Sequence, residues 1–314
     1  MTRGAEIQSP MTESAPILSL VAAPGSAGLV DAAIQRVAAV LGVAPDQGQC
    51  LAPAEAWEIA LPAAAGLQEP LRPKLMAALD NIPVDVNLLA PRGRSRRKRL
   101  LVADMESTII EQECLDELAD YAGLRPRIAA ITERAMRGEL DFEAALKERV
   151  GLLAGLDARV LQEIYDDRVT LMPGAATLIA TLRANGTHCA LVSGGFTFYT
   201  ERIAARLGFN EQQANTLDVA GGKITGTVAS PILGREAKLQ ALQRLARQLG
   251  IDETDAMATG DGANDLAMIK AAGLGVAYRA KPIVAQEAQA AVRHGDLTAL
   301  LYLQGYRKSE FVTA

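Results

Sequence analysis

A short apolar run that ends in a carboxylate constrains this chain most. Leu100-Leu-Val-Ala is followed directly by Asp104 and, two residues later, by Glu106. Buried parallel strands read as continuous apolar runs, and open α/β sheets bind ligands beyond the carboxyl ends of their strands. The run therefore predicts a buried strand, with Asp104 at a functional edge and Glu106 on the same face. Two carboxylates so close suit a nucleophile with an acid or base, or a metal site; an ordinary strand-end Asp in a turn is the alternative.

Two downstream segments add polar residues at similar places. Ser193 and Gly194 follow a second apolar run, and a helix that begins at Phe196 would direct its positive end toward a bound anion. Lys238 falls in the first turns of a predicted helix. Such a lysine is usually solvated, so it carries little weight alone.

A glycine-rich turn supplies further acidic residues. A predicted strand runs into Gly260-Asp261-Gly262, and Asn264 and Asp265 follow at the start of a helix. Acidic side chains on such a turn suit an oxygen-ligated hard cation such as Mg²⁺.

Taken in this order, these segments resemble those of the haloacid dehalogenase superfamily of phosphotransferases, from about Leu100 to the C-terminus. Within the superfamily the chain is similar to the phosphoserine phosphatase family, whose cap pattern matches Glu113, Met136, Phe142 and Arg149. The resemblance implies Mg²⁺-dependent hydrolysis of O-phospho-L-serine to L-serine and phosphate, the last step of serine biosynthesis. The fold that it implies is α/β, a Rossmann-like parallel sheet with an all-helical cap.

The resemblance also implies a role for each matched residue. Asp104 would attack phosphorus and form an aspartyl-phosphate, with Glu106 as general acid and base. Asp104, the main-chain carbonyl of Glu106 and Asp261 would bind Mg²⁺, with Asp265 in support. The phosphoryl group would be held by Ser193, Gly194, Lys238 and Asn264.

Glu106 departs from the family pattern, which has Asp at this position. Its side chain is one methylene longer, so the carboxyl can shift by about 1.5 Å unless the backbone compensates. Mispositioning of about 1 Å can cost on the order of a hundredfold in rate. We expect an active enzyme because every other matched position is intact. The alternative is a decayed site that only senses an amino acid.

Glu113 and Arg149 predict the substrate. Arg149 suits the carboxylate of phosphoserine, because arginine makes a two-pronged contact with a planar carboxylate. Glu113 would face the ammonium group, with Met136 and Phe142 closing an apolar lid. The alternatives are solvated surface charges, or an enzyme for another small phosphate ester such as phosphohomoserine or a methionine-salvage intermediate.

The chain divides into parts of different character. Residues 1–15 are polar and small, and we expect them to be mobile. Residues 16–90 follow a β-α-β-β-α-β order, which is typical of a ferredoxin-like sandwich. In the family such a domain commonly resembles the amino-acid-binding (ACT-like) type, which leaves serine binding, homodimerisation and simple packing open. Six basic residues within 91–99 favour a solvated linker over an RNA or membrane patch. We expect the phosphatase domain over 100–314, with the cap at about 112–168.

Secondary structure is predicted from the same patterns. In the first part, strands are expected at 17–22, 48–52, 56–61 and 84–89, and helices at 27–41 and 70–79. In the second part, cap helices are expected at 112–121, 126–137, 142–153 and 158–165. Further strands are expected at 187–192, 257–259 and 274–277, with a hairpin over 217–228.

Composition excludes several classes of protein. The 314 residues carry a net charge of −5, which argues against a nucleic-acid-binding surface. Cys50, Cys114 and Cys189 give no disulfide framework and favour a reducing cytoplasm, and two histidines are too few for a zinc site. The chain begins with no signal-peptide pattern, and no apolar run approaches about 18 residues, so we expect neither secretion nor a membrane partner.

Overall fold

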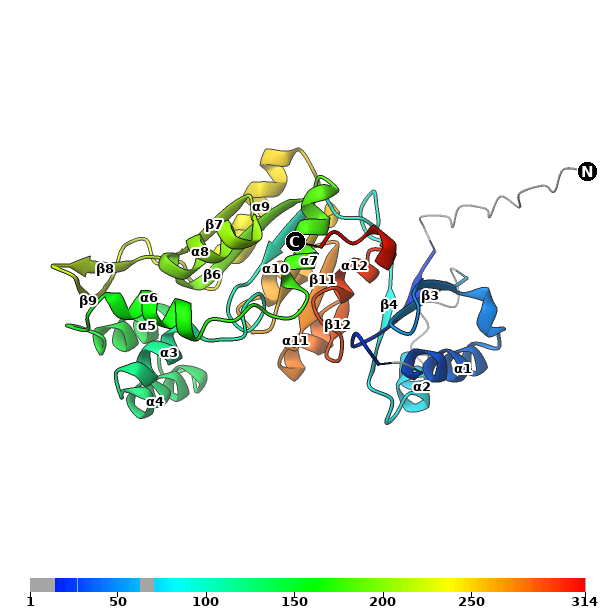
Figure 1. The fold of residues 1–314 in the computed structure, drawn as a ribbon, viewed down its shortest axis with the longest axis horizontal. Helices are drawn as coiled ribbons and strands as arrows, with labels where there is room; N and C mark the ends of the chain where they lie inside the picture. The colour runs from blue at the N-terminus through cyan, green and yellow to red at the C-terminus, as the bar shows by residue number, and fades with distance from the viewer. Residues whose placement is uncertain (1–14, 27, 63–70, 314) are drawn as a thin grey trace, which may run out of the picture.

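Two β-sheets organise the computed structural model, which describes residues 15–26, 28–62 and 71–313 (Figure 1). The segment 1–14, predicted to be mobile, lies outside the described residues. Among those described, no helix is long and apolar enough to cross a membrane.

The N-terminal sheet has four antiparallel strands in the order β2-β3-β1-β4. Their bounds are β1 Ile17–Ala22, β2 Gln49–Ala52, β3 Ala56–Ala60 and β4 Val84–Leu89. Two helices, α1 Leu29–Leu41 and α2 Leu71–Ala78, follow β1 and β3, and the short 3₁₀ helix η1 covers Pro45–Gln47. Chain order and strand order together are those of a ferredoxin-like sandwich, as predicted.

Helix α1 joins this sheet through one apolar face. Val30, Ala33 and Val37 recur at helical spacing and are buried in a cluster with Leu18 and Trp57 of the sheet. Gly42 then ends the helix with φ +67°, a left-handed conformation that glycine adopts without a steric cost.

The larger sheet has six parallel strands in the order β12-β11-β10-β5-β6-β7. Their bounds are β5 Leu100–Ala103, β6 His188–Phe196, β7 Glu211–Asn215, β10 Ala256–Gly260, β11 Leu274–Tyr278 and β12 Ala290–Val292. The chain moves outward from β5 through β6 and β7, then crosses to β10 on the other side of β5. Ligands bind at such a switch point, beyond the carboxyl ends of the strands. The predicted Rossmann-like sheet is confirmed, although β7 and β12 were not among the predicted strands.

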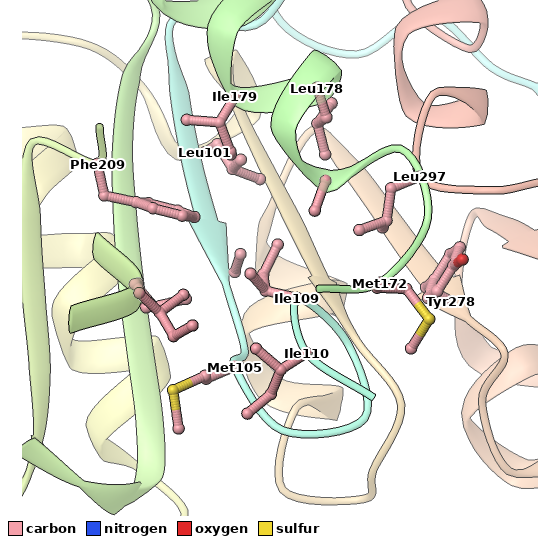
Figure 2. Close-up of a cluster of buried hydrophobic side chains, with 14 of the residues drawn as sticks. Leu101, Met105, Ile109, Ile110, Met172, Leu178, Ile179, Phe209, Tyr278 and Leu297 are labelled. Carbon is pink, nitrogen blue, oxygen red and sulfur yellow. The ribbon is translucent and has the colours of Figure 1, made fainter. Parts of the chain in front are cut away.

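Helices cover both faces of this sheet and bury its apolar side chains (Figure 1). Figure 2 shows Leu101 of β5 beside Leu178 and Ile179 of α7, with Ile109 and Ile110 of the loop after β5 in the same cluster. This packing holds the loop after β5 against the sheet. The helices and 3₁₀ helices of this part are α7 Ala175–Ala184, α8 Thr197–Leu207, α9 Ala237–Leu249, η2 Glu253–Asp255, α10 Leu266–Ala271, α11 Pro282–Glu287, α12 Ala299–Tyr302 and η3 Lys308–Glu310.

A helical cap follows β5, at the end of the molecule away from the N-terminal sheet (Figure 1). Its helices are α3 Cys114–Tyr121, α4 Arg125–Met136, α5 Phe142–Gly151 and α6 Arg159–Asp167, close to the four predicted ranges. The predicted hairpin is also present, as β8 Leu217–Ala220 and β9 Lys223–Val228. Its backbone bonds to the loop between α5 and α6, through Gly155 N–H to Ile224 O at 2.8 Å and Ile224 N–H to Leu156 O at 2.9 Å. The hairpin therefore belongs to the cap.

The basic segment 91–99 is packed between the sheets, so the expectation of a solvated linker is wrong for several of its residues. Lys98 is 5% exposed and donates to the carbonyls of Arg92, Ser95 and Thr254 at 2.5 to 2.9 Å. Arg96 pairs with buried Glu58 of β3 through both guanidinium nitrogens. A buried cation is retained only where its donors are satisfied, and three carbonyls satisfy the three ammonium hydrogens of Lys98.

Candidate active site

The carboxyl ends of β5 and β10 bring the predicted acidic residues together. Ala103 pairs with Thr259 in register, and the Asp104 N–H continues the pairing by donating to Thr259 O at 3.0 Å. Asp261 and Asp265 follow β10, and carboxylate oxygens of Asp104, Asp261 and Asp265 lie within 4.8 Å of one another. The sequence therefore placed these three residues correctly at one edge of the sheet.

Lys238 joins this cluster from α9. Its Nζ lies 2.8 Å from Asp104 Oδ1 and 2.5 Å from Asp265 Oδ1, and all three side chains are buried. Burial alone would lower the pKa of Lys238, but the charges of Asp104 and Asp265 raise it above its ordinary value. Lys238 therefore stays an ammonium group beside the expected nucleophile.

The cluster has more negative than positive charge in a place with little water. Burial raises the pKa of Asp104 well above its usual range, with Lys238 opposing and the Asp265 charge adding to the rise. Burial and the Asp265 charge also raise the pKa of Asp261. Such a site favours a bound cation, because a positive charge would stabilise the ionised carboxylates.

The donor set fits a hard divalent ion such as Mg²⁺ and assigns unequal parts to the three acids. Both oxygens of Asp265 are engaged, one by Lys238 and one by the Gly262 N–H at 3.0 Å. Asp104 uses Oδ1 for Lys238 and the Met105 N–H, and among the described residues neither Asp104 Oδ2 nor the Asp261 carboxylate has a hydrogen-bond partner. Asp104 and Asp261 are thus the available ligands, and Asp265 supports them.

The end of β6 forms a glycine loop on the other side of Asp104. Ser193 is buried, and its Oγ accepts from the Gly195 N–H at 2.9 Å. Asn215, at the end of β7, donates to Gly194 O at 2.8 Å and accepts from the Leu233 N–H at 2.7 Å. Asn215 therefore ties the glycine loop to the segment that precedes α9, the helix in which Lys238 lies.

A small pocket opens between this loop and the cap. Phe142, the first residue of α5, reaches over the loop, and its Cζ would lie 3.3 Å from a β-carbon at Gly194. A larger residue than glycine would crowd the ring, so Gly194 leaves room for Phe142 to close the pocket. The pocket is lined by Phe142, Val192, Ser193, Gly194, Gly234, Arg235, Ala237, Lys238 and Asn264. The predicted phosphoryl-binding residues thus share one pocket.

Glu106 lies in the turn after β5 and contacts α3 of the cap. Its Oε1 accepts from the Cys114 N–H at 2.8 Å, and the Cys114 thiol also bonds to this carboxyl group. Burial raises the pKa of Glu106, and the two bonds from Cys114 oppose the rise. The longer acid is therefore held in a defined position rather than free to move.

Glu113 precedes α3 and Arg149 lies in α5 of the cap. Glu113 accepts from Ser107 Oγ at 2.7 Å and keeps access to solvent. Its surroundings still raise the pKa of Glu113 to about 7, first through desolvation and then through the Glu106 charge. Burial lowers the pKa of Arg149, while the charges of Asp116, Glu106 and Glu113 oppose this. Arg149 is thus near enough to Glu106 and Glu113 for their charges to act on its guanidinium group.

Two contacts of the site were not found from the sequence. Asn215 ends a polar strand, and no apolar run marks that strand in the sequence. The bonds of Asn215 to Gly194 and Leu233 could therefore not be predicted. From the sequence, Cys114 was interpreted only as a cysteine without a disulfide partner; it is buried, and it also bonds to Glu106. Its position directly after Glu113 was the available clue. Met136 ends α4, and its side chain lies outside the described residues.

Comparisons with known proteins agree with this geometry. A family model described as haloacid dehalogenase-like hydrolase matches residues 101–270. A phosphoserine phosphatase of Streptomyces coelicolor is 44% identical over 246 residues, which are 78% of this chain and 60% of that protein. The phosphoserine phosphatase SerB2 of Mycobacterium tuberculosis is 39% identical over 310 residues, 98% of this chain and 75% of that protein.

A solved structure resembles nearly the whole chain. The haloacid dehalogenase family hydrolase of Salmonella enterica superposes with a TM-score of 0.81 at 29% identity, covering 92% of this chain and 98% of that one. Both families recognised from the sequence are thereby confirmed. The chain belongs to the haloacid dehalogenase-like hydrolases and, within them, to the phosphoserine phosphatase family.

Proposed function

We propose that this protein hydrolyses O-phospho-L-serine to L-serine and phosphate, the last step of serine biosynthesis, with Asp104 as nucleophile. The observation that carries the proposal is the contact of Asp104 with Lys238, which lines one pocket together with Ser193, Gly194 and Asn264. A carboxylate nucleophile with an ammonium group at hydrogen-bond distance, next to a glycine loop, suits transfer of a phosphoryl group.

In the first step, Asp104 attacks phosphorus and forms an aspartyl-phosphate as the serine oxygen leaves. Lys238, the Ser193 hydroxyl and the Gly194 N–H stabilise the charge on the phosphoryl oxygens. Mg²⁺ held by Asp104 and Asp261 would neutralise repulsion between the nucleophile and the phosphate dianion.

Glu106 supplies proton transfer in both steps. As general acid it donates a proton to the leaving serine oxygen, and the resulting carboxylate then takes a proton from the attacking water. Burial raises the pKa of this carboxyl group, which favours the first of these roles. Bonds from Cys114 orient the carboxyl group for this exchange.

Substrate selection rests on the cap. L-Phosphoserine carries an ammonium and a carboxylate group besides its phosphate, and Glu113 and Arg149 complement that pair. A phosphate ester without these two groups would not need both residues, whereas phosphohomoserine carries them too. We therefore favour an amino-acid phosphate over other esters, and catalysis over a sensor, because the nucleophile, its lysine and the acid cluster are all in place.

The decisive measurement is Mg²⁺-dependent phosphate release from L-phosphoserine, phosphohomoserine, phosphothreonine and p-nitrophenyl phosphate. We expect kcat/KM to be highest for L-phosphoserine and to vanish in Asp104→Asn, whose amide fits the site but cannot attack phosphorus. Higher kcat/KM for another ester would reassign the substrate. No release from any of the four esters would leave only a sensor. The cytoplasmic location and a homodimer through the N-terminal sheet stay predictions.

A further inference from the structure

A cavity of about 60 Å³ lies where the two sheets meet, at the end of the parallel sheet opposite to Asp104. Its apolar wall comes from Ile17 of β1, Leu89 of β4, Leu274 at the start of β11, and Leu303. The remaining wall is the segment 90–98, which contains most of the basic run. The two sheets therefore enclose a space that is apolar on one side and cationic on the other.

Three of the six cations of this run have partners already. Arg96 pairs with Glu58, Arg97 pairs with Glu310 and stacks on Tyr306, and Lys98 is satisfied by three carbonyls. These residues hold the segment in place, and their charges are compensated.

Arg92 and Arg94 line the cavity, and neither forms an ion pair among the described residues. The charge of Arg94 acts on exposed Asp252, whose pKa is lowered by hydrogen bonds from Thr254 and, to a smaller extent, by that charge. Among the described residues, the guanidinium of Arg92 has the side-chain amide of Gln289 as its hydrogen-bond partner, and the guanidinium of Arg94 has none. Both side chains are exposed at the rim. The site thus has two guanidinium groups whose hydrogen-bonding capacity for an anion remains available.

The backbone at Gly93 and Arg94, and not the two guanidinium groups, contacts the buried acid Asp255. Gly93, between them, has φ +81°, and a β-carbon there would collide with Thr254 O and Asp255 Oδ1. Asp255 Oδ1 is engaged by the Arg94 backbone N–H at 2.6 Å. Asp255 therefore anchors the turn through the main chain and does not pair with either guanidinium group.

We propose that this cavity binds a small carboxylate with a short apolar chain, its carboxylate on Arg92 and Arg94 and its chain against Ile17, Leu89 and Leu274. Arginine recognises a carboxylate through paired N–H donors, and apolar side chains favour a hydrocarbon tail. A cavity needs about 10–15 Å³ to hold a single water, so about 60 Å³ leaves room for a ligand of a few non-hydrogen atoms. Propionate, with five, has the right size. None of the described residues that line the cavity is acidic, so an ammonium group would find no carboxylate partner there and an amino acid fits less well.

The test is an amide NMR titration of the full-length protein with sodium propionate, at constant ionic strength. Propionamide serves as the neutral isostere and inorganic phosphate as an anion without an apolar chain. We expect saturable shifts at the amides of Gly93 and Gly273 with propionate, at a dissociation constant on the order of millimolar for so small a ligand. Phosphate should shift Gly194 at the active site far more than Gly93.

Arg94→Gln and Arg92→Gln should each weaken propionate binding about tenfold or more, because each removes a charge-assisted bond. Arg99→Gln is the matched control, since Arg99 is an exposed member of the same basic run outside the cavity wall. Three results would overturn the proposal: equal shifts with propionamide, equal shifts at Gly93 with phosphate, or unchanged affinity in the arginine variants. A loss equal to theirs in Arg99→Gln would also overturn it, because general charge would then explain the binding.

Discussion

A β-carbon on Gly195 would lie 2.6 Å from Glu106 Oε2, so the carboxyl of Glu106 occupies space that only glycine leaves open. The other oxygen of this carboxyl is held by the Cys114 N–H at 2.8 Å. The position of Glu106 is thus set from two sides, by a donor in α3 and by the absence of a side chain in β6. These two contacts therefore hold the carboxyl group of Glu106 in one position, although its side chain is one methylene longer than that of the Asp in the family pattern.

The first prediction tests this relationship. Gly195→Ala should displace the Glu106 carboxyl group and lower kcat on L-phosphoserine by about tenfold to a hundredfold, as expected for a shift near 1 Å. Glu106→Asp in the same chain should recover part of the loss, because the shorter side chain withdraws from the new methyl group. The four kcat values of the double-mutant cycle measure the coupling. Additive effects of the two changes would show that Gly195 and Glu106 act independently.

The second prediction concerns proton transfer by Glu106. Glu106→Gln keeps the size of the side chain and removes its acid and base function, so kcat on L-phosphoserine should fall by about 10²–10⁴-fold. An aryl phosphate needs little protonation of its leaving group, so its first step should suffer less and phosphoenzyme should accumulate. Rapid-quench kinetics with p-nitrophenyl phosphate would detect this as a burst. Wild-type turnover of L-phosphoserine in Glu106→Gln would assign the proton to another group.

The strands and acids of the active site were predictable because parallel strands carry a local signal. The run before Asp104 and the turn at Asp261 both mark the end of a buried strand, and parallel pairing then brings their carboxyl ends together. The cap helices were equally evident from their apolar spacing.

Polar strands and side-chain contacts between the sheets could not be predicted from the sequence, and the reason is physical. β7 consists of Glu211-Gln-Gln-Ala-Asn215, with little apolar character, and it is stabilised by pairing with β6 rather than by its own pattern. Lys98 looked solvated because its partners are main-chain carbonyls, one of them at Thr254, far along the chain. Only the tertiary structure shows that such a cation has compensating partners.

The third prediction concerns the carboxylate of the substrate. Arg149→Ala should reduce kcat/KM for L-phosphoserine by about tenfold or more, since a charge-assisted bond to its carboxylate is lost. p-Nitrophenyl phosphate has no carboxylate, so its kcat/KM should change little. The ratio of the two kcat/KM values in wild type and variant is the measurement. Equal losses on both substrates would show that Arg149 supports the cap or the phosphate instead.

Arg134→Ala is a suitable control for this comparison. Arg134 also belongs to the cap, but it pairs with Glu148 and Glu139 on the exposed surface. Exposed ion pairs of this kind contribute little to stability, so both substrates should be turned over as in the wild type. A selective loss of kcat/KM for L-phosphoserine in Arg134→Ala would show that the effect is not specific to Arg149.

The fourth prediction is a pH dependence that originates at Glu113. Its pKa is raised to about 7, and only the ionised carboxylate can pair with the ammonium group of L-phosphoserine. The KM for L-phosphoserine should therefore be constant above the pKa of Glu113 and should rise as pH falls below it, approaching tenfold per pH unit. Bound Mg²⁺ would stabilise the carboxylate, so in the complete enzyme the transition should lie at or somewhat below pH 7.

The phosphate group of the substrate also titrates, near pH 6, so the contribution of Glu113 has to be separated from it. Phosphoglycolate keeps the phosphate and the carboxylate but lacks the ammonium group, and its KM should follow the phosphate titration alone. In Glu113→Gln the KM for L-phosphoserine should be raised at pH 8 and should then follow the same profile as phosphoglycolate. Steady-state kinetics between pH 5.5 and about 8.5 provide the test. If the wild type and Glu113→Gln share one pH profile on L-phosphoserine, Glu113 does not bind the ammonium group, and another residue must supply that contact.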